Sequence, residues 1–481
     1  MKKYFMFATV AIAALFASCS NSDDFVAPQV TSEDVDSGDA LVPIQIGVTQ
    51  NYDLSTTRGT GTVGSVGGTD DASLWDNQLI NVFMFNKGTL DLATEKDATT
   101  GADVPLFDNQ LMITPGSKNA IPGSTASYHS GQAMIWDTDD ASKQGVIKYY
   151  PIMGNFDFFG YHGDDAITTK PTLNTAKNAF EVPFAIDGSQ DLMSTKAIQS
   201  TSTWPNTNDD VTRYFSAYSG RRGIHPNLAF DHLLTRLQFN IKAGNDEAAG
   251  VEAGVQPDPY ASATTYSGVY VTKIEIFSRI TGSLITAWTP EAGILDNPNG
   301  DANLAEQIRG QKIKWDALVY DTNDPSANTC GWVQLKQRPA PGTDPSVALV
   351  ALSPVAPEYA AGETDKFPLK TVGEALIVSK PVTIIPNNEM TEATSVTEDG
   401  NTYYIRITLE QTVPDNHKGT STTRKTFMRI SSFTPPEGET AFKLGYSYNV
   451  NLVLYGAEEI KVFTSVARWE EVDNPVKVEV E

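Results

Sequence analysis

The chain has 481 residues, with 59 Asp and Glu against 35 Lys and Arg, and its formal net charge is −24. This excess of negative charge would repel nucleic-acid phosphates and anionic lipid headgroups, so we expect no nucleic acid among its partners and no peripheral docking on anionic membranes. An acidic, solvated surface is the simpler interpretation. The length allows two or three domains, and short apolar runs broken by 36 Gly and 27 Pro favour an all-β fold.

The N-terminus has the layout of a cleavable signal peptide. Lys2 and Lys3 precede an apolar stretch, residues 4–16, that is shorter than the roughly 20 residues of a membrane-spanning helix. Small residues and then Cys19 follow. We therefore predict that residues 1–18 are a lipoprotein signal and that Cys19 carries lipid. The mature protein would then be anchored at the surface of a Gram-negative outer membrane. The alternative is an ordinary signal peptide beside a buried cysteine.

The only other cysteine is Cys330. Because an acylated Cys19 cannot pair, we expect no internal disulfide and no cysteine metal cluster. The histidines show neither metal-type spacing nor an HExxH motif: His129, His162, His225, His232 and His417. His232 lies among apolar residues, which favours a hydrogen-bonded strand histidine over a metal ligand.

Other candidate chemistry has a simple structural explanation. Gly59, Gly61 and Gly64 match G-x-G-x-x-G, but no helical pattern follows them, so a flexible loop is favoured over a dinucleotide site. The acidic runs 137–140 and 296–301 do not follow the EF-hand spacing, and acidic turns explain them as well as calcium sites do. No nucleophile elbow or other catalytic constellation is present. We therefore expect no enzyme activity, no metal and no cofactor.

After the signal, residues 19–40 are polar and acidic, which is typical of a flexible tether. Residues 41–50 then form the first strand-like segment. Four of its residues share one parity and would line one face of a strand: Val42, Ile44, Ile46 and Val48.

Arg58 is the only basic residue between Cys19 and Lys87, and it lies in a run rich in Gly, Ser and Thr. Such a run is accessible to proteases. An arginine-specific protease would cut between Arg58 and Gly59 and so separate the tether and the first strand from the rest of the chain. The alternative is an ordinary surface arginine in a polar loop.

Further strand patterns recur along the chain: 79–85, 146–152, 156–162, 228–243, 269–279, 374–380, 382–386, 402–411, 446–456 and 460–469. We expect 269–279 to pair with 228–243.

A polar connector around 196–222 suggests two domains, an N-terminal β-sandwich at 41–222 and a C-terminal β-sandwich at 223–481. Residues 290–370 would be an insertion with one short helix near 302–309. Alternating valines close the sequence in the segment 475–481: Val476, Val478 and Val480.

Several segments, in this order, resemble the fimbrillin family, the lipoprotein-derived subunits of type V pili. They span most of the chain: SCSNSDD, the first strand with TTRGT, KYYPIMGNFDFFGYHG, SQDLM, LAFDHLLTRLQF and LGYSYNVNLVLYGAEEIKVFTSVARWEE. The segment 290–370 departs from the pattern.

The resemblance implies two transthyretin-like β-sandwiches and assembly by donor-strand exchange. Val42, Ile44, Ile46 and Val48 would form a removable plug strand, and cleavage at Arg58 would open a groove. Val476, Val478 and Val480 of another subunit would then fill that groove. Partners would be other pilus subunits and a receptor on a host or bacterial surface. The long insertion favours an accessory or tip-like subunit.

A different class of function remains open. A monomeric cell-surface lipoprotein could bind glycans or another ligand through exposed tryptophans. The chain has seven candidates: Trp75, Trp136, Trp204, Trp288, Trp315, Trp332 and Trp469.

Overall fold

The structure is a computed structural model. It describes residues 41–50 except 43 and 45, 79–113, 135–136, 148–197, 220–222, 226–251, 268–295, 302–337, 350–414 except 361, 363 and 399, 422–456 and 460–467. Cys19, Arg58, Gly59 and the three C-terminal valines lie outside these residues.

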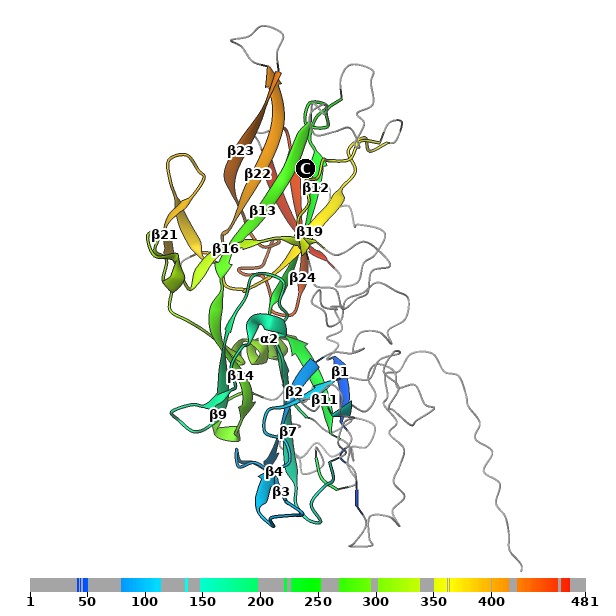
Figure 1. Cartoon of the computed structure of the whole chain (residues 1–481). Helices are drawn as coiled ribbons and strands as arrows, with labels where there is room; N and C mark the ends of the chain where they lie inside the picture. Colours follow the sequence, from blue (N-terminus) through cyan, green and yellow to red (C-terminus); the bar gives the residue numbers. More distant parts are fainter. Residues whose placement is uncertain are drawn as a thin grey trace, which may run out of the picture.

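The described chain is nearly all β, and its sheets are mostly antiparallel, which confirms the all-β prediction. Figure 1 shows an elongated molecule in which two β-sandwiches lie end to end. We call the lower one the first sandwich and the upper one the second sandwich. Among the described residues no helix is long and apolar enough to cross a membrane.

The first sandwich packs a seven-stranded sheet against a four-stranded sheet. The order of the larger sheet is β1 (Gly47–Gln50), β11 (Asn227–His232), β10 (Met193–Lys196), β7 (Phe156–His162), β2 (Leu79–Asn86), β5 (Gln110–Ile113) and β6 (Ile135–Trp136). The order of the smaller sheet is β15 (Ile313–Trp315), β14 (Thr281–Trp288), β9 (Ala179–Ala185) and β8 (Thr172–Leu173).

The second sandwich packs a six-stranded sheet against another four-stranded sheet. The order of the larger sheet is β18 (Val350–Ala351), β17 (Lys336–Gln337), β19 (Lys370–Ile377), β12 (Thr235–Ala243), β24 (Ser447–Leu454) and β25 (Ile460–Ala467). The order of the smaller sheet is β16 (Cys330–Gln334), β13 (Val269–Arg279), β22 (Tyr403–Pro414) and β23 (Thr422–Phe433).

Short elements complete the described structure: the hairpins β3 (Thr94–Lys96) with β4 (Asp103–Pro105) and β20 (Thr383–Pro386) with β21 (Ala393–Thr397), the helix α2 (Ala302–Gln311), and the 3₁₀ turns Asp164–Ala166, Pro290–Ala292 and Pro325–Ala327. The helix confirms the prediction near 302–309.

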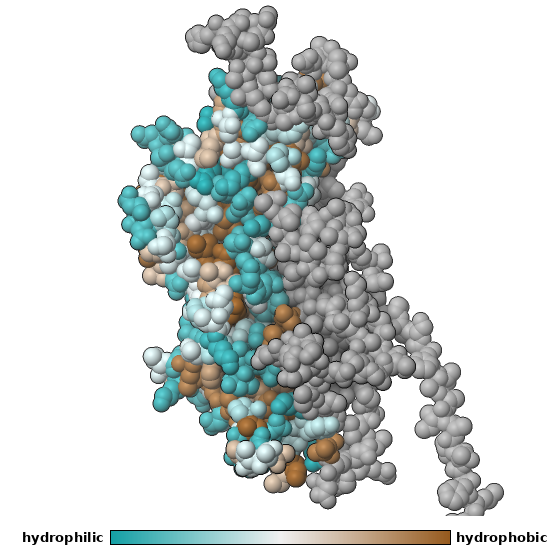
Figure 2. All heavy atoms as spheres, viewed as in Figure 1, coloured by the Kyte–Doolittle hydropathy of each residue, from teal (hydrophilic) through white to brown (hydrophobic). Residues whose placement is uncertain are grey.

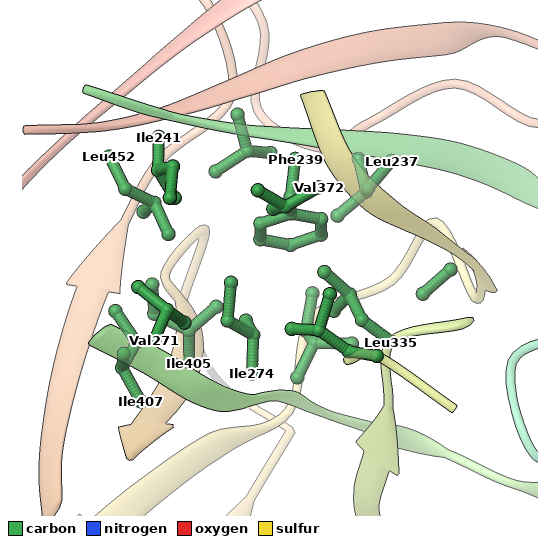
Figure 3. Close-up of a cluster of buried hydrophobic side chains, with 14 of the residues drawn as sticks. Leu237, Phe239, Ile241, Val271, Ile274, Leu335, Val372, Ile405, Ile407 and Leu452 are labelled. Atoms are coloured by element: carbon green, nitrogen blue, oxygen red, sulfur yellow. The ribbon is translucent and has the colours of Figure 1, made fainter. Parts of the chain in front are cut away.

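The second sandwich has an aliphatic and aromatic core between its two sheets (Figure 3). Phe239 and Ile241 of β12 face Ile405 and Ile407 of β22 across this core. In β22 these buried residues alternate with the partly exposed Tyr404 and with polar residues, as expected for a strand with one buried face.

The seven-stranded sheet of the first sandwich is buried on both faces. In β2, Ile80 and Val82 belong to one apolar cluster, while Phe83 and Phe85 belong to the cluster that packs against the four-stranded sheet. Every residue of β7 is buried. A strand buried on both faces reads as a nearly continuous apolar run, and 156–162 follows this pattern except at Asp157 and His162.

Two nearly continuous strand runs connect the sandwiches. The chain passes from β11 to β12 across residues 233–234, and from β13 to β14 across Ile280 (Figure 1). Consequently β11, β14, α2 and β15, which follow residue 222, lie in the first sandwich, where β14 pairs with β9. The division into folding units at 222 and 223 stays a prediction.

One expected pairing is wrong. Strand β13 does not pair with β12: it pairs with β16 and β22 and faces β12 across the core. Alternation identifies the buried face of a strand but not its neighbour, so the sequence could not separate a sheet partner from a partner in the opposite layer.

On the face seen in Figure 2, hydrophilic residues are interspersed with smaller hydrophobic groups. The most exposed large apolar side chains among the described residues are scattered over both sandwiches. They are Leu41, Ile152, Met153, Ile385 and Val466.

Candidate functional site: the first strand and its apolar bed

The segment 41–50 places three apolar side chains in a buried cluster on the face of the seven-stranded sheet that points away from the four-stranded sheet. Val42 is 4 % exposed, Ile44 is 2 % exposed and Ile46 is 0 % exposed. Because they are two residues apart, all three point to the same side of an extended chain. Val42, Ile44 and Ile46 thus share a buried side, as their parity predicted, but the described strand β1 is shorter than the predicted 41–50 and begins after them, at Gly47.

These side chains complete a cluster that covers the outer face of the seven-stranded sheet. We call the rest of this cluster the apolar bed: Ile80, Val82, Met84, Ala93, Leu106, Phe107, Met112, Tyr150, Phe156, Phe158, Met193, Ala197, Leu228 and Phe230. Within it, Phe158 makes edge contacts with Phe107 and Tyr150, at centroid distances of 6.2 Å in both pairs. Burial raises the pKa of the Tyr150 hydroxyl.

Backbone hydrogen bonds hold the segment in two ways. In its first half, the Ile44 amide donates to the Lys148 carbonyl at 2.8 Å, and the Tyr150 amide donates to the Val42 carbonyl at 2.9 Å. In its second half, β1 pairs in parallel with β11, with Val48 opposite Leu228. Strand β1 is the last strand at that edge of the described sheet.

Burial of the three side chains stabilises this arrangement by roughly 4.5–9 kcal/mol before ordering costs, at about 1.5–3 kcal/mol for each. The resident strand is therefore held by a free energy comparable to the stability of a whole domain. The same apolar area would be exposed to water if the strand left.

Gly160 of β7 shows how closely the bed is packed. A Cβ atom at this position would lie 2.9 Å from Leu228 Cδ1 and 2.9 Å from Phe230 Cζ. These separations are too short for carbon atoms in contact, so only glycine lets the two side chains of β11 cross over β7 here.

The opposite face of the same sheet contains buried ion pairs. The Asp157 carboxylate lies 2.5 Å from Lys87 Nζ and 3.1 Å from Lys196 Nζ, and it also accepts from the Gly88 amide at 2.7 Å. Asp157 is 1 % exposed and Lys196 is 0 % exposed. Burial lowers the pKa of Lys87, and the neighbouring Asp157 carboxylate only partly offsets this.

A second ion pair joins the two sheets. Lys312 Nζ lies 3.0 Å from Asp231 Oδ2 and donates to the Ser194 carbonyl at 2.9 Å. Sequence reasoning did not find these charges, because a lysine in a strand usually marks a solvent-facing position.

Two of the five histidines lie at the end of this sheet. His232 Nδ1 is 2.7 Å from Asp191 Oδ2, so the predicted hydrogen-bonded strand histidine is confirmed. His162 lies between two acceptors, the Leu79 carbonyl at 2.7 Å from Nδ1 and Asp164 Oδ1 at 3.0 Å from Nε2. Both ring nitrogens then donate, which requires the charged imidazolium. Burial opposes this charge, but Asp164 and the hydrogen bonds outweigh it, so the pKa of His162 is raised.

Among the described residues no group of three or more His, Cys, Asp and Glu side chains could hold a metal ion. The acidic runs 137–140 and 296–301 lie outside the described residues, as do His129, His225 and His417. Cys330 is buried and unpaired, and burial raises the pKa of its thiol to about 11.

The side chains of three tryptophans are described. Trp288 is buried against Phe159, and Trp315 and Trp332 are partly buried. The Arg406 guanidinium covers one face of Trp332, at 4.6 Å from the ring centroid. Of these three rings, the buried Trp288 offers no face on which a sugar could stack.

No protein-family model and no curated protein matches the sequence. Solved structures similar to this chain include a protein from Bacteroides uniformis whose name assigns it provisionally to cell adhesion, with 13% identity, a TM-score of 0.34, and coverage of 89% of this chain and 99% of the other. A similarly named protein from Bacteroides fragilis has 11% identity, a TM-score of 0.32, and coverage of 90% and 100%.

The fimbrial anchor protein Mfa2 from Porphyromonas gingivalis is similar at 8% identity, with a TM-score of 0.26 and coverage of 88% and 97%. Similarities this low carry no weight in assigning a function.

Proposed function

We propose that the chain is a cell-surface subunit of a type V pilus, derived from a lipoprotein and assembled by donor-strand exchange. The observation that carries the proposal is the first strand. Its residues Val42, Ile44 and Ile46 are buried directly before the edge strand β1, and the sequence that joins β1 to β2 contains Arg58. A structural subunit of this kind performs no chemistry of its own.

In this mechanism the lipid on Cys19 anchors the chain at the outer membrane. The first strand meanwhile keeps the apolar bed covered, and the subunit remains monomeric. Cleavage between Arg58 and Gly59 removes the covalent link that keeps the strand at a high effective concentration beside its bed. The strand is then held by noncovalent contacts alone and can be displaced.

A donor strand must satisfy both the exposed edge of β11 and the apolar bed. Strand addition to a sheet edge supplies main-chain hydrogen bonds, and alternate side chains fill the apolar positions. Val476, Val478 and Val480 have the same two-residue spacing as Val42, Ile44 and Ile46, so this segment is the proposed donor. In the fibre, this chain would be an accessory or tip-like subunit that binds a receptor on another surface.

The test compares three proteins in which Cys19 is replaced by Ala so that they are not acylated. After treatment with an arginine-specific protease, the chain with Arg58 should start at Gly59 and form oligomers in analytical ultracentrifugation. Arg58→Ala should remain intact in this loop and monomeric. Arg58→Lys is the matched control: it should resist the arginine-specific protease but oligomerise after trypsin.

The proposal fails if the chain cleaved at Arg58 stays monomeric at high concentration and behaves like Arg58→Ala. A monomeric ligand-binding lipoprotein would then be the better explanation. The burial of Trp288 and the partial burial of Trp315 and Trp332 do not favour that function.

A further inference from the structure

We infer that the apolar bed selects a donor strand with isoleucine at two successive alternate positions, and that this donor belongs to a pilus subunit of different sequence from this chain. The inference rests on the proposed function and names the partner of the same site. The apolar bed of the first sandwich would accept side chains of the size of isoleucine at the positions of Ile44 and Ile46.

The resident strand defines that size. Its three buried positions carry Val42, Ile44 and Ile46, and burial is deepest at the two isoleucines, which are 2 % and 0 % exposed. Ile44 and Ile46 are therefore out of reach of water. A smaller residue at either position would leave an empty cavity that water does not fill.

The bed has little freedom to close over such a void. Phe107, Phe158 and Tyr150 hold one another in edge contacts. The side chains of Leu228 and Phe230 already lie against the backbone of Gly160. When the surroundings of a core position cannot relax, the loss of one methylene costs both its transfer free energy and the resulting cavity.

The chain's own C-terminal segment does not meet this requirement. Its alternate apolar positions are all valine, at 476, 478 and 480. When the three valines face the bed, in either strand direction, valine occupies the places of Ile44 and Ile46. Each missing methylene should weaken binding by about 2- to 12-fold, the range that isoleucine-to-valine changes show in protein cores.

The difference in size between valine and isoleucine would make the bed specific for its donor strand. A donor with smaller side chains leaves cavities and binds more weakly, although no contact repels it. The tail of an identical subunit therefore binds the bed more weakly and displaces the resident strand only at high subunit concentration. A subunit whose donor carries isoleucine at both positions fills the bed completely. The chain should therefore accept such a different subunit more tightly than another copy of itself.

The experiment uses the full mature chain. The sequence around Arg58 is replaced by the recognition site of a highly specific protease, so that the chain is cut only there. Cys19 carries a fluorophore that labels the first strand. After cleavage, displacement of the labelled first strand by a synthetic peptide lowers the fluorescence anisotropy. The first peptide is the chain's own segment 472–481. The second carries Val478→Ile and Val480→Ile. The control carries Lys477→Ile and Glu479→Ile, which add apolar bulk on the opposite face.

The peptide with Val478→Ile and Val480→Ile should displace the strand at a concentration about 5- to 150-fold lower than the chain's own segment, because two methylenes are restored. The control peptide should show no such gain. In the reciprocal variant, Ile44→Val with Ile46→Val in the chain, the chain's own segment should displace the resident strand at a correspondingly lower concentration.

Equal displacement by the chain's own segment and the isoleucine peptide would overturn the size selection while leaving strand exchange intact. The same conclusion would follow if the control peptide gained as much as the isoleucine peptide. If no peptide displaces the strand, strand exchange itself fails, and the proposed function fails with it.

Discussion

One sheet edge of the first sandwich differs from two edges of the second in how its paired strands are connected. In the second sandwich, β22 pairs with β23 and β24 pairs with β25 along their lengths, and in both pairs the strands are neighbours in the sequence. In the first sandwich, β1 pairs in parallel with β11, about 180 residues further along the chain. A hairpin strand cannot leave its partner without unfolding the hairpin, whereas a strand whose partner is distant in sequence can be detached by one cut.

Both sandwiches bury ion pairs beside their apolar clusters. In the second sandwich, Arg236 of β12 pairs with Glu374 of β19 at 2.6 Å. The first sandwich buries Asp157 with Lys196, and Asp231 with Lys312, on one face of its main sheet. Buried ion pairs contribute less to stability than apolar packing of the same volume, but the removal of one partner is costly. Substitution of one partner of such a pair should therefore be costly in either sandwich, and most costly where one carboxylate faces two lysines, as Asp157 does.

The largest effect is expected for Asp157→Asn. This change keeps the side-chain size but removes the negative charge beside Lys196 and Lys87, and it should destabilise the first sandwich by about 3–5 kcal/mol. Urea unfolding followed by hydrogen exchange of β7 amides would measure it. Asp103→Asn in the hairpin of β3 and β4 is the control, because the ion pair of Asp103 with Lys96 is exposed, so the loss should be smaller. Equal losses at the two sites would show that burial of an ion pair does not decide what its loss costs.

Ile46→Ala should come next, at about 2–5 kcal/mol, because it leaves a cavity above the apolar bed. Amide exchange should accelerate in β1 and β11 and stay unchanged in β22 and β23. The reverse pattern should follow Ile407→Ala, which lies in the core of the second sandwich. If Ile46→Ala left β11 exchange unchanged, the first strand would not be part of the cooperative unit that contains β11.

Gly160→Ala should cost about 1–3 kcal/mol, because the new Cβ atom would overlap Leu228 and Phe230. Gly331→Ala in β16 is a matched strand substitution in the second sandwich, since its Cβ would meet nothing closer than 3.9 Å. Thermal unfolding of both variants tests the difference. An equal fall in stability for the two would show that the close contact at Gly160 carries no cost.

The smallest effect is expected from pH. The pKa of His162 is raised in the folded protein, where Asp164 and Asp191 face the ring and His232 binds Asp191. A raised folded pKa adds stability that is complete below the ordinary pKa of about 6.5 and is lost as the pH rises through the folded value.

His162→Gln removes this contribution, so the variant should lose more stability relative to the natural chain at about pH 6 than at about pH 9. Free energies of unfolding at both pH values would show this. A difference between the two proteins that does not change with pH would mean that His162 is not charged in the fold.

The sequence by itself was sufficient to identify elements whose pattern is local. The alternation in 269–279 and the apolar run 156–162 predicted β13 and β7, and the parity of Val42, Ile44 and Ile46 predicted their shared buried face. Each of these signals depends on the direction of neighbouring side chains, which the backbone geometry of a strand determines.

Only the tertiary structure decided which strands meet. It placed β13 opposite β12 instead of beside it, brought β14 to β9, and enclosed Lys196 beside Asp157. It also placed His162 between Leu79 and Asp164. These relations join residues far apart in the chain, or depend on whether both faces of a strand are covered. Local alternation is the same for an edge strand and a central strand. It therefore does not tell which strands are neighbours or whether both faces of a strand are covered.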